Sequence, residues 1–102
     1  MKYSINGYIK AIPEKRKELL GYLLEAAKEM NAVESCHVYI VGVNNEESDN
    51  VYVYEVWDSE EAHKASLSLP VFQLLIQKAR PIIAGLESYP ALMIYGGKGL
   101  KE

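Results

Sequence analysis

The sequence predicts an α+β protein with the element order β-α-β-β-α-β, and three observations support this. Strand-like segments of β-branched, aromatic and alternating apolar residues occupy positions 3–12, 36–43, 51–57 and 88–95. Two stretches with apolar residues at helical spacing lie between them. The 102 residues show no linker and suit one domain, 1–102. This order is the split unit of a ferredoxin-like sandwich, with a four-stranded antiparallel sheet and both helices on one face.

The first helix is predicted over residues 14–30. Its leucine, alanine and methionine residues recur at helical spacing, and charged residues separate them. Pro13 suits the first turn of a helix, and Asn31 is expected to end it.

The second helical stretch is expected to begin at Asp58 or Ser59, because either residue is a good N-cap. We expect Pro70 to interrupt the helix, since proline lacks the amide hydrogen that the helix interior needs. The helical pattern then resumes over residues 71–79, and Pro81 is expected to bend or end it.

The last strand is predicted over residues 88–95. Pro90 lacks a donor for the sheet, so we place it at the start of this strand or at a sheet edge. Residues 95–102 are expected to form a C-terminal tail. A polar loop over residues 44–50 is expected to join the second and third strands as a hairpin.

Composition and charge narrow the possible partners. The formal net charge is −3 and the basic residues form no run, which argues against nucleic acid and against an anionic membrane surface. Cys36 is the single cysteine, so an intrachain disulfide is impossible. The sequence shows no signal-type or membrane-spanning apolar stretch, and we expect a cytoplasmic protein.

Strand alternation predicts that both faces of the sheet are apolar. In the third strand, Glu55 and Trp57 share one side with two valines, while Tyr52 and Tyr54 share the other side with Val56. An antiparallel sheet with one solvated face alternates apolar and polar residues instead. We therefore expect a homodimer in which a second copy covers the face opposite the helices.

Three segments carry a resemblance to a known family: the strand "VYVYEVW", the following "DSEEAHKASL", and the later "LPVFQLLIQKARPII". They resemble the antibiotic biosynthesis monooxygenase family, whose members are dimeric ferredoxin-like α+β barrels. The resemblance covers nearly the whole chain. Members of this family differ in function, so the resemblance leaves three possibilities. Some members oxidise a phenol or quinol with molecular oxygen and without metal or flavin, some relatives degrade haem, and many have no assigned substrate.

The resemblance and the strand alternation together indicate candidate catalytic residues. Trp57 lies on the side of Glu55, where it forms either ordinary core or the wall of a substrate cavity. Asn6 lies mid-strand, where asparagine is disfavoured, and is a candidate to hold a substrate oxygen. His63 is a candidate general base, or else a half-exposed helix residue.

Candidate substrate-binding residues are Glu55, Phe72 and Tyr8. We expect no cofactor: residues 66–75 hold no histidine for a haem of the kind that the haem-degrading relatives bind, and no spacing suggests a metal site. The alternative to an enzyme is a non-catalytic dimer that binds a small ligand or has a structural role. Five further tyrosines either line a cavity or pack at the dimer interface, and we favour the interface: Tyr39, Tyr52, Tyr54, Tyr89 and Tyr95.

Overall fold

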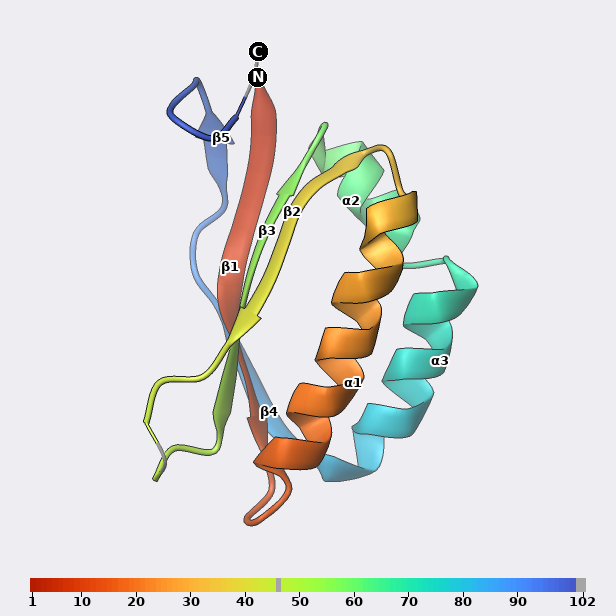
Figure 1. The fold of residues 1–102 in the computed structure, drawn as a ribbon, viewed down its shortest axis with the longest axis vertical. Coiled ribbons are helices and arrows are strands. Elements are labelled where there is room, and N and C mark those ends of the chain that lie inside the picture. The colour runs from red at the N-terminus through yellow and green to blue at the C-terminus, as the bar shows by residue number, and fades with distance from the viewer. Residues whose placement is uncertain (46, 101–102) are drawn as a thin grey trace.

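The computed structural model describes residues 1–45 and 47–100. It has the predicted ferredoxin-like α+β architecture, with one antiparallel sheet and helices on one side of it (Figure 1). The elements in chain order are β1 (Lys2–Ala11), α1 (Arg16–Glu29), β2 (Cys36–Gly42), β3 (Asn50–Trp57), α2 (Glu60–Ser66), α3 (Pro70–Ala79), β4 (Ile83–Ser88) and β5 (Leu92–Ile94), with 3-10 turns at Met30–Ala32 and Arg80–Ile82.

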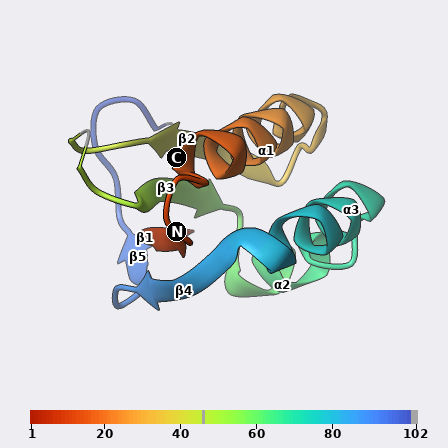
Figure 2. The same ribbon diagram turned by 90° about the horizontal axis from the view of Figure 1, so that it is seen from below.

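The strands lie in the order β2-β3-β1-β4, with β5 paired to β1 beside β4. Figure 2 shows all three helices on one side of this sheet, with α1 over β2 and β3 and the other two toward β1 and β4. Directly paired residues share a face, so Tyr39, Glu55 and Ile5 form one row across three strands. Asn6 pairs with Tyr54 on the opposite face.

The prediction of a single last strand over residues 88–95 is wrong in its bounds. The fourth strand, β4, begins earlier at Ile83 and pairs with the second half of β1. After Pro90 the chain returns to the same edge as the short β5 and pairs with the first residues of β1. Pro90 itself lies between the two strands, where no ladder hydrogen bond needs its missing donor. The sheet therefore has five strands rather than four.

The helices follow most of their predicted signals with small shifts, but Pro13 lies in a turn before the first helix rather than in its first turn. α1 begins at Arg16, because Glu14 adopts a left-handed conformation with φ of 69° that a helix cannot include. Ser59 caps α2 by accepting a hydrogen bond from the amide of Ala62. α3 starts with Pro70 in its first turn. No described helix is long and apolar enough to cross a membrane.

The core lies between the sheet and the helices in two clusters. One surrounds Leu19, Leu23 and Val51, and the other joins Trp57 to Phe72 of α3. Trp57 is fully buried, with 0% of its surface exposed. This confirms that the side of the third strand that carries Glu55 and Trp57 faces the helices.

The opposite face of the sheet is apolar and partly open. Ile40 is 61% exposed and Tyr54 39% exposed, while Val56 is buried. The rings of Tyr8 and Tyr52 pack on this face with centroids 5.4 Å apart. Coverage of this face by a second copy remains a prediction. The last two residues of the predicted tail, 101–102, fall outside the described residues.

Candidate functional site

A cavity of about 450 Å³ lies between the helix side of the sheet and α2, with walls from β1, β2, β3 and β4. Its volume is within the usual range for a small-molecule site. Apolar side chains form most of its surface, and the polar groups at its walls come from a few residues. The apolar set includes Ile5, Val53, Leu67 and Leu86, and the polar set includes Tyr39, Glu55, His63 and Ser88.

Gly7 forms part of the cavity floor and allows β1 and β4 to approach closely. A Cβ atom at this position would lie 2.1 Å from the carbonyl oxygen of Glu87. Any side chain would therefore force the two strands apart. The glycine both keeps the sheet intact here and leaves the floor between Ile5 and Ile9 without a side chain.

Three side chains form a polar group at the edge of the cavity. Trp57 donates its indole N–H to Oε1 of Glu55 at 2.9 Å. The same oxygen lies 3.9 Å from Nε2 of His63, and the rings of Trp57 and His63 meet edge to face with centroids 5.7 Å apart. The Glu55 and His63 side chains are only 15% and 19% exposed. A carboxylate and an imidazole are thus held together in a mostly apolar setting.

Burial shifts the pKa values of Glu55 and His63 in the directions that favour their uncharged forms. Burial raises the pKa of Glu55, and the hydrogen bond from Trp57 partly opposes that shift. Burial lowers the pKa of His63 below 6.5, against the pull of the nearby Glu60 carboxylate. His63 is therefore an uncharged imidazole at neutral pH, which is the form that accepts a proton.

Two further groups near Glu55 stay protonated at neutral pH. Burial, reinforced by the Glu55 charge, raises the pKa of Tyr39, so its hydroxyl remains a hydrogen-bond donor. The same two causes raise the pKa of the Cys36 thiol to about 11. Cys36 is consequently a poor nucleophile, because the thiolate is the reactive form.

Comparison with known proteins identifies the family. The antibiotic biosynthesis monooxygenase sequence profile matches residues 2–78, which is more than half of the chain. The chain belongs to this family. The match ends before β4, so the fourth and fifth strands lie beyond it. No curated protein is significantly similar in sequence.

One solved structure supports this assignment, and others share the fold. A family protein from Chloroflexus aurantiacus is 37% identical, with a TM-score of 0.86 over 99% of this chain and 100% of that one. A protein from Bacteroides thetaiotaomicron is 21% identical with a TM-score of 0.85, over 98% of this chain and 96% of that one. One from Deinococcus radiodurans is 20% identical with a TM-score of 0.79, and both chains are fully covered. The last two support the fold alone.

The six residues singled out from the sequence fall into three places. Glu55 and His63 line the cavity of this family member. Trp57 and Phe72 lie behind its wall, in the core cluster, and neither contributes to the lining. Trp57 acts on the cavity only through its hydrogen bond to Glu55.

Asn6 and Tyr8 do not join the polar group. Both belong to the stretch of β1 that forms the floor, but alternation along the strand directs their side chains to the opposite face. Tyr8 packs there against Tyr52 and Tyr89. Asn6 and Trp57, both candidate catalytic residues, therefore lie on opposite faces of the sheet and do not meet at one site.

The sequence interpretation missed Tyr39 as a cavity residue. We expected it at the dimer interface, but it pairs with Glu55 and faces the helices, with its ring 6.0 Å from that of Phe72. A slip in the strand register makes this hard to foresee: β2 has an irregularity between Cys36 and Val38. Leu67 and Leu86, which line the cavity while remaining 45% and 69% exposed, were also not singled out.

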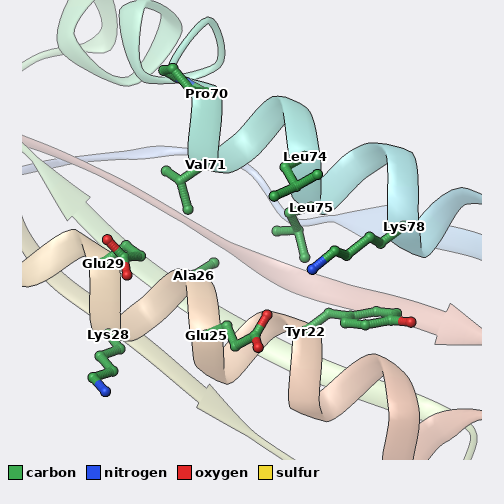
Figure 3. Close-up of a pocket in the computed structure, with 10 residues that line it drawn as sticks. All are labelled: Tyr22, Glu25, Ala26, Lys28, Glu29, Pro70, Val71, Leu74, Leu75 and Lys78. Atoms are coloured by element: carbon green, nitrogen blue, oxygen red, sulfur yellow. The ribbon is translucent and has the colours of Figure 1, made fainter.

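A second cavity, of about 500 Å³, lies between α1 and α3 (Figure 3). Figure 3 shows Tyr22 and Lys78 at one end of this cavity and Val71 and Glu29 at the other. Its charged groups lie on exposed helix surface, where water screens them. No group of three or more potential metal ligands occurs among residues 1–45 and 47–100. We therefore place the candidate site beneath α2.

Proposed function

We propose that the protein oxidises a small phenol or quinol with molecular oxygen in the cavity beneath α2. The observation that carries the proposal is the position of the His63 imidazole, set 3.9 Å from the Glu55 carboxylate in a largely apolar cavity where burial lowers its pKa. An imidazole is a suitable base near neutral pH. It takes the phenolic proton, and the imidazolium that forms is stabilised by the adjacent carboxylate.

Oxidation then proceeds from the phenolate. The phenolate transfers an electron to oxygen, and a C–O bond forms at a ring carbon that carries hydrogen, para to the phenolic oxygen in a simple phenol and ortho to it in a hydroquinone. Loss of water leaves a quinone. One oxygen atom stays on the ring, and the other leaves in water with the hydrogens of the phenolic O–H and the ring C–H.

The protein contributes position and environment to this reaction. The largely apolar walls reduce contact between the phenolate and water, and the sheet and α2 hold the ring between them. The hydroxyl of Tyr39 stays protonated and is available to donate to a developing oxyanion. The family membership of the chain supports the same reaction class.

Oxygen consumption with a panel of hydroquinones tests this proposal. We expect saturable uptake with formation of a hydroxyquinone, which carries the added oxygen atom, and loss of uptake in His63→Gln by roughly a hundredfold, the usual contribution of a general base. Uptake that is absent with every compound, or unchanged in His63→Gln, contradicts the proposal.

A second candidate function is ligand binding without catalysis. One observation favours it: of the three residues expected to be catalytic, Asn6 faces away from the cavity and Trp57 is buried behind it. Only His63 remains in position to act on a substrate. Saturable binding of hydroquinones without oxygen consumption would favour this alternative.

A further inference from the structure

We propose that the cavity beneath α2 selects uncharged hydroxylated aromatic compounds and excludes those that carry a carboxylate, with Glu55 as the residue that sets this selectivity. The inference rests on the proposed function and names the substrate class of the same site. Two features support it: the cavity lining contains no lysine or arginine, and the Glu55 carboxylate is held in place by Trp57.

The described residues that line the cavity offer an anion no permanent positive charge. They include neither lysine nor arginine; Glu55 is the acidic residue that faces the cavity, because Glu87 pairs with Tyr8 and its side chain is directed to the other face. The one basic side chain is His63, which is uncharged at neutral pH because burial lowers its pKa. A ligand carboxylate would therefore lose its water shell without gaining a counter-charge.

Glu55 cannot swing out of the way of an incoming anion without losing its own partner. Oε1 accepts the indole N–H of Trp57 at 2.9 Å, and that indole is fully buried against α1 and α3. The donor is thus rigid, and moving the carboxylate would leave a buried N–H unsatisfied. Trp57 is in this sense a positioning residue for Glu55.

The other oxygen of Glu55 suits a hydroxyl. Oε1 of Glu55 makes both contacts of this carboxylate, one to Trp57 and one to His63. No described side chain forms a hydrogen bond with Oε2. A phenolic O–H is a donor, and a bond from it to a carboxylate is charge-assisted. The same position would bring a ligand carboxylate into repulsive contact with Glu55 in a site of low dielectric constant.

Binding of three related compounds tests the inference, measured by titration calorimetry under nitrogen so that oxidation cannot interfere. The compounds are hydroquinone, gentisate, which adds a carboxylate to the same ring, and methyl gentisate, which keeps the added bulk but is uncharged. We expect hydroquinone and methyl gentisate to bind with similar affinity. Gentisate is expected to bind at least roughly tenfold more weakly than methyl gentisate, from like-charge repulsion at short range.

Two glutamine variants assign the selectivity to one residue. Glu55→Gln keeps an oxygen for the Trp57 N–H but removes the charge, and we expect it to reduce the difference between gentisate and methyl gentisate to less than about threefold. Glu87→Gln is the matched control, because Glu87 is exposed and pairs with Tyr8 toward the other face. It should leave the difference unchanged. Thermal melting of both variants checks that they are folded.

The possible outcomes separate this inference from the proposed function. Equal binding of gentisate and methyl gentisate, or a difference that persists in Glu55→Gln, overturns the charge selection and leaves the monooxygenase proposal standing. Charge selection without oxygen uptake supports the inference and overturns the monooxygenase proposal. Binding of none of the three compounds overturns both.

Discussion

Trp57 donates its indole N–H to Oε1 of Glu55 at 2.9 Å, two residues earlier on the same strand. Residues at this spacing share a face of the sheet, so the strand itself sets the two side chains next to each other. Trp57 is fully buried, whereas Glu55 reaches the cavity. The tryptophan is therefore core by position, and its influence on the site passes through the carboxylate that it holds.

Trp57→Phe should reduce stability and disturb the cavity together. The substitution removes a hydrogen bond to a charged acceptor and shrinks a buried ring, and we expect the free energy of unfolding to fall by about 2–4 kcal/mol. The unbonded Glu55 carboxylate should also lose its fixed position, which weakens binding of hydroquinone. Urea denaturation followed by circular dichroism measures the first effect, and calorimetric titration the second.

Phe72→Leu is the matched control for Trp57→Phe. It loosens the same core cluster but removes no hydrogen bond to Glu55. We expect a loss of stability of about 1 kcal/mol with little change in hydroquinone affinity. If the two variants weaken ligand binding equally, the tryptophan acts only as packing.

Glu55→Gln should stabilise the folded protein at neutral pH. Burial raises the folded-state pKa of Glu55 above its ordinary value of 4.5, so its ionisation costs stability once the pH rises through that folded-state pKa. Glutamine keeps the acceptor for Trp57 without a charge, and we expect a gain of roughly 1 kcal/mol at neutral pH. The gain should vanish near or below about pH 4, where wild-type Glu55 is protonated as well. Thermal melts of both proteins from about pH 4 to neutral pH measure this difference in stability. A variant that is less stable than the wild type at neutral pH contradicts the expectation.

The element order and the orientation of β3 were predictable from the sequence because both depend on local patterns. Alternation alone placed Glu55 and Trp57 on one side, and a serine before two glutamates marked the start of α2. The fourth strand was not predictable in the same way. The segment from Ile83 to Ser88 becomes a strand by pairing with β1, and its sequence carries an exposed Leu86 and a glycine rather than a clear alternation.

The composition of the site depends on register, which the sequence does not show directly. For this reason Tyr39 was expected on the wrong face, and Asn6 was expected near a substrate although its face was not known. Asn6 pairs with Tyr54 on the face away from the helices, and Tyr39 pairs with Glu55 after the irregularity in β2. A shift by one residue reverses the direction of every side chain, so strand pairing must be known before a residue is placed in a cavity.

Ile40→Glu should convert the predicted homodimer to a monomer. Ile40 is 61% exposed on the apolar face of the sheet, and a charge buried in an interface there would lack a partner. Leu74→Glu is the control, because Leu74 is similarly exposed, at 51%, on α3 on the other side of the sheet. Sedimentation equilibrium at micromolar concentration should give a dimer for the wild type and the control. A wild-type monomer contradicts the prediction of a covered face.

The proposed monooxygenase activity should depend on pH through His63. Burial lowers the pKa of His63 below 6.5, so its basic form persists to lower pH than that of a free histidine. We expect kcat/KM for hydroquinone to rise with pH, to level off before neutrality, and to have its inflection below 6.5. His63→Gln should be nearly inactive and lack this inflection.

The pH dependence of protein stability tests the ionisation of His63 independently of turnover. The folded-state pKa of His63 lies below the unfolded value of 6.5. The wild type should therefore lose stability as the pH falls from 6.5 to the folded-state pKa, and His63→Gln should lose less stability over the same pH range. His37→Gln is the matched control: His37 pairs with Asp58 at the surface, ahead of α2, and does not line the cavity. It should retain both the activity and its inflection. An inflection that persists in His63→Gln would assign the proton transfer to another residue and remove the base from the mechanism.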